Sequence, residues 1–329
     1  MSSIQIHILP VFNDPRIAPD EWARLLAQGD TDVVFLTWHW CRSWWETLGR
    51  GMLLLVAAEL DGRIFAIAPL FAIEGMIFFA GAGVSDYLDF IGNLGSSDTL
   101  AAMLEAARGQ VPGFCGFRFH HLPKSSRTPA LLRAAAPRLG LECHFVDDIA
   151  AVDVDLVGQR ERVLETINRS MRKREEKLHR NGTLEIRQVK DVDAIRGLLP
   201  TFYALHVARW ESKAEVSQFA LPGQRAFLEL FMESVADQEW TRFLWLEWNG
   251  EFLGAEVDWY YRGTHYSGPW CFALERAKFS PGQVLLRQSV LAALDAGLHT
   301  FDLGTGDQTY KLRLPARIRK CETWALYLP

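Results

Sequence analysis

The clearest pattern of hydrophobic and polar positions is a pair of β-hairpins, one in each half of the chain. The first joins LLLVAAEL to RIFAIAPLF across Asp61-Gly62, and the second joins FLWLEW to EFLGAEVDWYY across Asn249-Gly250. Asp-Gly and Asn-Gly between runs of aliphatic and aromatic residues are typical of tight two-residue turns. The pattern therefore predicts two hairpins of the same layout.

The segments around each hairpin also repeat. In each half we expect a Trp-bearing or aromatic helix, the hairpin, a strand, an amphipathic helix and a further strand, followed by a shorter helix and a last strand. Outside the hairpins, the expected helices and strands lie at 38–48, 76–80, 98–108 and 116–122 in the first half and at 199–210, 264–272, 282–296 and 299–303 in the second. This order predicts an α/β (α+β) chain, duplicated in tandem, with mixed and mostly antiparallel sheets flanked by helices.

The join between the two copies is expected near residue 155, which gives an N-terminal domain over 1–155 and a C-terminal domain over 156–329. A chain of 329 residues is long enough for two cores. A long helix is predicted over 159–180, ending at Asn181-Gly182 with a left-handed cap. It carries eight basic and four acidic residues. The simplest interpretation is that they form a solvent-exposed face, and the alternative is that they contact phosphate.

Composition and charge narrow the class of protein. Apolar residues make up 49% of the chain and charged residues 23%, as in globular proteins, and the net charge of -5 argues against a broad nucleic-acid-binding face. No apolar run is long enough to span a membrane, and the N-terminal segment does not resemble an export signal. Five scattered cysteines without CxxC spacing indicate a reducing compartment and no metal site. We therefore expect a cytoplasmic protein, whose oligomeric state the sequence does not disclose.

Three phrases of the second half point to a family. ALHVARW, FSPGQVLL and AGLHTFDLGTGDQTYK occur in this order, and the segment 35–71 adds a Trp-rich helix and an APLF strand. Together they resemble the CelD-type acyltransferases, a GNAT-superfamily branch named for cellulose biosynthesis and related to the Fem aminoacyl transferases. The resemblance implies a tandem GNAT fold. It also implies transfer of an acyl group from acyl-CoA or acetyl-CoA to a small-molecule, glycan or lipid-linked acceptor of the envelope or an exopolysaccharide.

The same resemblance places the donor at the start of the helix after the central strand, where unpaired N–H groups and the helix dipole favour a pyrophosphate. In this sequence that start is Ser280, Pro281, Gly282 and Gln283. Proline suits a first turn, glycine permits close approach of a phosphate, and Ser280 is expected to cap the helix. The segment departs from the usual Q/R-x-x-G-x-G/A loop, which leaves an acyl carrier or aminoacyl-tRNA open as donors and an ordinary capped helix as the plain alternative.

Tyr310 is the expected catalytic residue. It follows the Gly304-Thr305-Gly306 turn, at the place where many GNAT enzymes hold a tyrosine that protonates the departing thiolate, and a phenol keeps its proton near neutral pH. The alternative is that Tyr310 packs and pairs with Lys311 beside Asp307. Lys311 and Asp307 are also expected to contact substrate.

Candidates for a general base lie on the second hairpin and on the helix before it. Glu256 and Asp258 alternate along one strand and so point to the same side. His206 is expected as a base and Arg209 as the ligand of an anionic acceptor, with Trp210 beside them as a contact to substrate. Asp302, which enters the glycine turn, either contacts substrate or accepts a hydrogen bond from backbone.

In the first half, Asp86 and Tyr87 follow a glycine-rich turn and are expected to line an acceptor groove or to form a plain surface turn. That half is expected to be the acceptor side, without donor binding. Three hypotheses follow: an acyl-CoA-dependent acyltransferase, a Fem-like transferase that uses aminoacyl-tRNA, and a non-catalytic scaffold protein of a polysaccharide-synthesis complex.

Overall fold

The computed structural model of the protein describes residues 4–329, and it divides into two compact units. Unit 1 contains the chain up to Ala150 together with Arg319–Pro329, and unit 2 contains Ala151–Ile318. Two strands, β7 (Glu142–Asp155) and β14 (Arg317–Tyr327), have residues in both units. The sequence-based division at residue 155 assigned residues 319–329 to the second copy; here they belong to unit 1, because residues 321–327 pair with one of its strands, a long-range pairing that no local pattern encodes.

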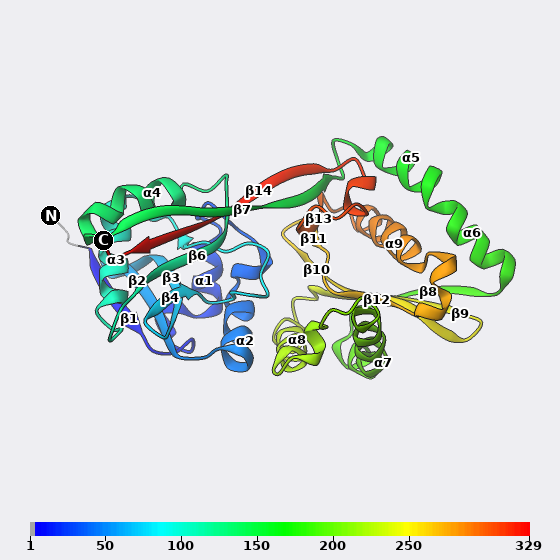
Figure 1. Ribbon diagram of the computed structural model, residues 1–329, viewed down its shortest axis with the longest axis horizontal. Helices are drawn as coiled ribbons and strands as arrows, with labels where there is room; N and C mark the ends of the chain where they lie inside the picture. Colours follow the sequence, from blue (N-terminus) through cyan, green and yellow to red (C-terminus); the bar gives the residue numbers. More distant parts are fainter. Residues whose placement is uncertain (1–3) are drawn as a thin grey trace. The chain divides into compact units, whose positions relative to one another are not determined.

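Unit 1 is a mostly antiparallel sheet with helices packed against it (Figure 1). Its strands follow the order β1-β2-β3-β4-β6-β14-β7; β4 and β6 pair in parallel, whereas β1–β2, β2–β3, β3–β4 and β6–β14 pair antiparallel. Its strands besides β7 and β14 are β1 (Gln5–Leu9), β2 (Met52–Leu60), β3 (Arg63–Ile73), β4 (Met76–Phe79), β5 (Ile91–Gly92) and β6 (Gly116–Pro123). The helices are α1 (Pro19–Leu26), α2 (Trp38–Leu48), α3 (Ser97–Arg108) and α4 (Thr128–Ala135), with single turns η1 (Pro15–Ile17), η2 (Val34–Leu36) and η3 (Ala136–Leu139).

Unit 2 repeats this architecture. Its strands follow the order β7-β13-β11-β10-β9-β8, with β12 also paired to β10. In Figure 1, α7 and α8 cover one face of the sheet, and α5, α6 and α9 lie over the other. The strands are β8 (Leu184–Val189), β9 (Thr241–Trp248), β10 (Glu251–Tyr261), β11 (Thr264–Tyr266), β12 (Trp270–Phe272) and β13 (Thr300–Thr305). The helices are α5 (Arg160–Ser170), α6 (Arg172–Asn181), α7 (Val192–Glu211), α8 (Gln224–Ser234) and α9 (Pro281–Asp295), with turns η4 (Gln218–Ala220), η5 (Leu274–Phe279) and η6 (Lys311–Arg313).

Both predicted hairpins are confirmed. Asp61 and Gly62 have φ of 52° and 76°, and Asn249 and Gly250 have φ of 55° and 78°. Two successive positive φ values define the turn that suits the twist of paired strands, which is why Asp-Gly and Asn-Gly occur there. With the repeated helices and strands around them, these hairpins confirm the predicted mixed, mostly antiparallel fold class.

The predicted single helix over 159–180 is wrong, because it breaks at Met171 into α5 and α6. Its apolar stripe changes partners there: Val163, Ile167 and Met171 belong to one buried cluster, whereas Leu178 belongs to another. The predicted left-handed cap is also wrong. Gly182 has a φ of 165°, which is extended backbone, and Thr183 N donates to Asn249 Oδ1 at 2.8 Å, so the chain leaves α6 directly into β8.

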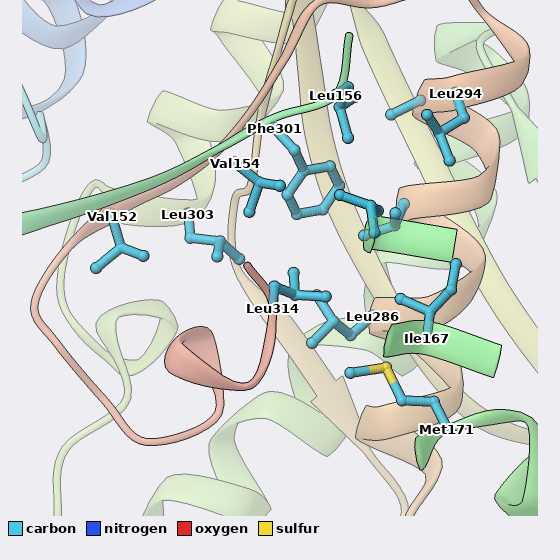
Figure 2. Close-up of a cluster of buried hydrophobic side chains, with 13 residues drawn as sticks. Val152, Val154, Leu156, Ile167, Met171, Leu286, Leu294, Phe301, Leu303 and Leu314 are labelled. Atoms are coloured by element: carbon cyan, nitrogen blue, oxygen red, sulfur yellow. The ribbon is translucent and has the colours of Figure 1, made fainter. Parts of the chain in front are cut away.

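One of these clusters fastens the start of unit 2 to its central helix. Figure 2 shows side chains of β7, β13, α5 and α9 meeting around Phe301, which is fully buried. Burial of aliphatic side chains from four elements stabilises their relative placement, at roughly 25 cal/mol for each Å² of apolar surface removed from water. This cluster holds α9 against the sheet and therefore fixes where its N-terminus lies.

The strand predicted over 264–272 is split. Over Thr264–Tyr266, β11 pairs antiparallel with β10 and in parallel with β13, and after the interruption at 267–269 β12 pairs with β10. No pairing between β12 and β13 occurs among residues 4–329. The two strands separate beyond residue 266, on the side where α9 begins.

Candidate functional site

A pocket of about 350 Å³ lies at the N-terminal end of α9, within unit 2. That volume is in the range of small-ligand sites. Six of the residues expected from the sequence to bind or react line it together: Ser280, Pro281, Gly282, Gln283, Arg209 and Tyr310. The other lining residues are Met171, Lys213, Trp270, Phe272, Leu286, Gln308 and Arg313.

The start of α9 is left without a capping side chain. Pro281 occupies the first turn, as predicted, but Ser280 has a φ of 57° and its side chain makes no cap hydrogen bond. The predicted serine cap is therefore wrong, because a serine in the left-handed conformation does not direct its hydroxyl toward the first amides. Pro281 has no N–H and Gln283 N donates to the Ser280 carbonyl at 3.0 Å, so in the first turn the N–H of Gly282 is the one left, within the described part of the chain, for an external acceptor.

Gly282 permits a close contact in the wall of the pocket. A Cβ atom at this position would lie 2.7 Å from Cζ3 of Trp270, closer than such atoms pack. Glycine is therefore required for the Trp270 ring to lie directly against the first turn of α9.

Arg209 and Trp270 are stacked on each other in the wall of the pocket. The Arg209 guanidinium lies 3.7 Å from the centre of the Trp270 ring, and its Nη1 donates to the Trp270 carbonyl at 3.2 Å. Only 9% of Arg209 is exposed, and its Nε has no hydrogen-bond partner among residues 4–329. A buried donor without an acceptor is costly, and a bound anion would satisfy it.

The charges around the pocket all have one sign. Arg209, Lys213 and Arg313 line it, and none of its lining residues is acidic. The positive end of the α9 dipole adds to the same potential. This combination favours an anionic ligand that also has an apolar part to contact the aromatic and aliphatic wall.

Tyr310 stands immediately before η6 and faces Trp270, with the two ring centres 5.7 Å apart in an edge-on arrangement. Its hydroxyl is a proton donor on a residue that lines the same pocket as the free end of α9.

Residues near Tyr310 stabilise the Gly304-Thr305-Gly306 turn that precedes it. Lys311 is buried and its Nζ donates to the carbonyl oxygens of Gly304 and Thr305, while Gly304 N donates to Asp302 Oδ1 at 2.7 Å. Of the two sequence-based readings of Asp302, the structure therefore shows the hydrogen bond to backbone. Lys311, Asp302 and the exposed Asp307 do not line the pocket, so their expected contacts with substrate have no support here.

Glu256 and Asp258 point to the same side of β10, as predicted, but that side is covered by α9. Asp258 lies 3.2 Å from His265 Nε2, accepts from Gly268 N at 3.1 Å and from Ser289 Oγ at 3.3 Å. Burial, and next the negative charge of Asp258, raise the pKa of Glu256 well above its usual range. Neither carboxyl lines the pocket, so the structure does not bring either to the place where an acceptor would lose its proton.

His206 has a structural role. Trp210 Nε1 donates to His206 Nε2 at 3.2 Å, and His206 Nδ1 lies 2.8 Å from Ser217 Oγ. Burial, and next the charge of Arg209, lower the pKa of His206 to about 4. Both ring nitrogens are engaged inside the fold and neither His206 nor Trp210 lines the pocket, so the interpretation of His206 as a base is not retained.

The loop singled out in the first half belongs to the interior of unit 1. Tyr87 is buried, with its ring centre 5.9 Å from that of Phe35. Next to it, Asp89 accepts from Thr31 Oγ1 at 2.7 Å and from Thr128 Oγ1 at 2.6 Å. The expectation of a plain surface turn is therefore wrong, while a role for Asp86 and Tyr87 in acceptor binding stays a prediction.

Sequence reasoning missed Trp270, Lys213 and Arg313 as pocket residues. Trp270 was recognisable as an aromatic residue two positions before the end of the strand that precedes the Pro-Gly helix start. Lys213 and Arg313 were not recognisable, because a basic residue near aromatic residues in the sequence is equally typical of a solvent-exposed surface. Among residues 4–329, no group of three or more His, Cys, Asp or Glu side chains is placed to hold a metal ion. Within the same residues, no helix has the length and hydrophobicity needed to cross a bilayer.

Comparisons with known proteins agree with this arrangement. Residues 167–312 match the acetyltransferase (GNAT) domain family Acetyltransf_6. No curated protein sequence matches the chain. Among solved structures, FemX is similar with a TM-score of 0.65 at 10% identity, over 93% of this chain and 96% of that one. L-PGS from Bacillus licheniformis has a TM-score of 0.58 at 12% identity, over 98% and 93%. A tandem GNAT protein from the clavulanic acid biosynthesis pathway has a TM-score of 0.55 at 12% identity, over 99% of both chains.

The sequence identities are too low to infer the substrate of this chain from these proteins. The structural similarity establishes the fold. The match over 167–312 contains every residue that lines the pocket except Arg313. The chain therefore has the fold of a tandem GNAT protein and carries, in unit 2, a segment that matches the acetyltransferase (GNAT) domain.

Proposed function

We propose that unit 2 is an acyltransferase that binds an acyl-CoA donor in the pocket at the start of α9 and transfers its acyl group to an amine or a hydroxyl. The observation that carries the proposal is the meeting of the uncapped end of α9, Arg209 and Tyr310 around one pocket. These are an anion-binding helix end, a buried cation with an unsatisfied donor, and a proton donor.

The residues of the pocket fit such a donor. The N–H group of Gly282 would donate to its pyrophosphate, with Arg209 and Lys213 adding positive charge. Trp270 and Phe272 supply an apolar wall for the chain between pyrophosphate and thioester, in the part of the sheet where β12 and β13 are not paired. Acetyl-CoA and acyl-CoA compounds with longer chains share these parts, so the residues of this pocket do not select the length of the acyl chain.

Tyr310 is proposed to donate its hydroxyl proton to the sulfur that leaves when the acyl carbon forms its new bond to the acceptor. The acceptor nitrogen or oxygen loses one proton in the same step. Neither Glu256 nor Asp258 lines the pocket, so we propose that this proton passes to water rather than to a carboxylate of β10. Proton donation by a positioned side chain typically contributes about 10²- to 10⁴-fold to the rate.

The acceptor is proposed from the family resemblance of the sequence to CelD-type transferases. It would be an amine or hydroxyl of an envelope or exopolysaccharide precursor, either a small molecule or a glycan or lipid-linked compound, with unit 1 on the acceptor side. Acylation of nitrogen and a cytoplasmic location are part of the same proposal.

The first test is thermal stabilisation of the protein by acetyl-CoA, longer acyl-CoA compounds and free CoA. A ligand that binds only the native state raises the melting temperature by mass action, and roughly 100-fold excess over Kd adds about 2.7 kcal/mol. Gly282→Trp should remove the shift, because any side chain there displaces Trp270. Gly197→Trp is the matched control, since Gly197 is an exposed residue of α7 with open space around its Cβ position.

A shift that Gly197→Trp keeps and Gly282→Trp loses supports the proposal. A wild-type protein that no CoA compound stabilises contradicts it. Stabilisation by aminoacyl-tRNA alone would then favour the tRNA-dependent transferase, and no response to either would favour a non-catalytic scaffold protein.

A further inference from the structure

A second hollow of about 360 Å³ lies beside the donor pocket, between α5 and η6. Three arginines line it: Arg162 and Arg169 from α5, and Arg313 from η6. Arg313 also lines the donor pocket, so the two hollows share a wall residue. A ligand that passes Arg313 would reach both.

The three guanidinium groups have no acidic partner within ion-pairing distance among residues 4–329. Arg162 Nη1 donates to Oε1 of the neutral Gln159 side chain at 3.4 Å. Glu165 is the one acidic residue that lines this hollow. By contrast, Arg172 on the following helix pairs with Glu176 at 3.1 Å. The hollow thus brings together three arginines that have no ion-pair partner in the described part of the chain.

The position of Arg162 is unfavourable for the helix itself. Arg160 and Arg162 stand in the first turn of α5, where the positive end of the helix dipole favours acidic side chains. Helix stability alone would favour Asp or Glu at Arg162. Mutual repulsion of Arg162, Arg169 and Arg313 adds to the cost, and a bound anion would turn both effects into attraction.

We infer that the hollow between α5 and η6 binds the outer phosphate of a nucleotide-bearing acyl donor whose pyrophosphate lies at the start of α9. The inference rests on the proposed function, since it requires the donor in the first pocket. The hollow is open to water and its arginines are exposed, which suits a phosphate near the end of a ligand rather than a reacting group. In CoA the ribose 3′-phosphate is such a group.

The test compares acetyl-CoA with 3′-dephospho-acetyl-CoA, which differs only by that phosphate, in calorimetric titrations at low and at physiological ionic strength. We expect the wild-type protein to bind acetyl-CoA about tenfold more tightly, the effect of one charge-assisted contact. The double variant R162Q/R169Q should bind acetyl-CoA about tenfold more weakly than wild type and leave the affinity for the dephospho compound unchanged. The difference should shrink as salt is added.

The matched control is R160Q/R180Q, which removes one charge from α5 and one from α6, both outside the hollow. It should keep the preference for acetyl-CoA. Equal wild-type affinity for the two compounds would overturn this inference and leave the proposed function intact, whereas binding of neither would contradict the proposed function itself. Binding of a short RNA hairpin that R162Q/R169Q loses, without any preference between the CoA compounds, would also overturn it, because the phosphates would then belong to a polynucleotide.

Discussion

Replacement of Arg209 by methionine tests whether Arg209 binds a ligand or stabilises the fold. Arg209→Met removes a stacking contact with Trp270, worth about 2 kcal/mol when desolvated, and a hydrogen bond to the Trp270 carbonyl, worth about 1.5 kcal/mol. It also removes a buried Nε without a partner, whose cost is about 1 to 3 kcal/mol, and buries an apolar chain in its place. We therefore expect the free energy of unfolding to fall by no more than about 2.5 kcal/mol.

Ligand binding should respond much more strongly. The guanidinium lines the pocket with the free end of α9, so loss of its charge-assisted contact should weaken acetyl-CoA binding by roughly 10- to 150-fold. Arg225→Met is the matched control: its guanidinium lies 4.9 Å from the centre of the Tyr203 ring and its Nε donates to the Phe219 carbonyl at 2.8 Å, away from the pocket. It should leave acetyl-CoA binding unchanged.

Urea unfolding and calorimetric titration of the two variants give both quantities. If Arg209→Met were destabilised by more than about 3 kcal/mol while binding acetyl-CoA like the wild-type protein, Arg209 would be a structural residue and the reasoning on its unsatisfied donor would be refuted.

Three further predictions concern single side chains. Tyr310→Phe should lower the rate of thiol release from acetyl-CoA, with a panel of amines and hydroxyl compounds, by about 10²- to 10³-fold and leave acetyl-CoA affinity nearly intact; an unchanged rate would remove Tyr310 from catalysis. The raised pKa of Glu256 means that the folded state binds a proton that the unfolded chain has lost above pH 4.5, so stability falls as pH rises; Glu256→Gln should therefore gain more stability relative to wild type at pH 8 than at pH 5, and urea unfolding with equal gains at both would contradict this. The lowered pKa of His206 has the opposite sign: its contribution is complete above pH 6.5 and is lost toward pH 4, by about 3 kcal/mol, and His206→Phe should flatten that part of the stability profile; a profile as steep as that of the wild type would show that His206 is not its source.

The features that could be predicted from the sequence are those set by local backbone chemistry. Asp61-Gly62 and Asn249-Gly250 specify hairpin turns because few other residues accept two positive φ values. Pro281-Gly282 likewise marks the start of α9, and the position of Tyr310 after a glycine turn placed it near that start.

The features that could not be predicted depend on which elements pack together. Alternation along β10 shows that Glu256 and Asp258 share a side, but only the packing of α9 over that side shows that both are buried. The break at Met171 has no proline or glycine to announce it, and it coincides with the passage of the apolar stripe between two clusters. Arg209 stands out as a candidate ligand-binding residue because its buried Nε lacks a hydrogen-bond partner, and no sequence pattern predicts this.

A crystal structure of the protein with acetyl-CoA tests the central claim most directly. The account predicts the pyrophosphate on the N–H group of Gly282 with Arg209 beside it, and the sulfur within hydrogen-bonding reach of the Tyr310 hydroxyl. Acetyl-CoA bound away from α9, or with its sulfur out of reach of Tyr310, would contradict the proposed acyl transfer at this pocket.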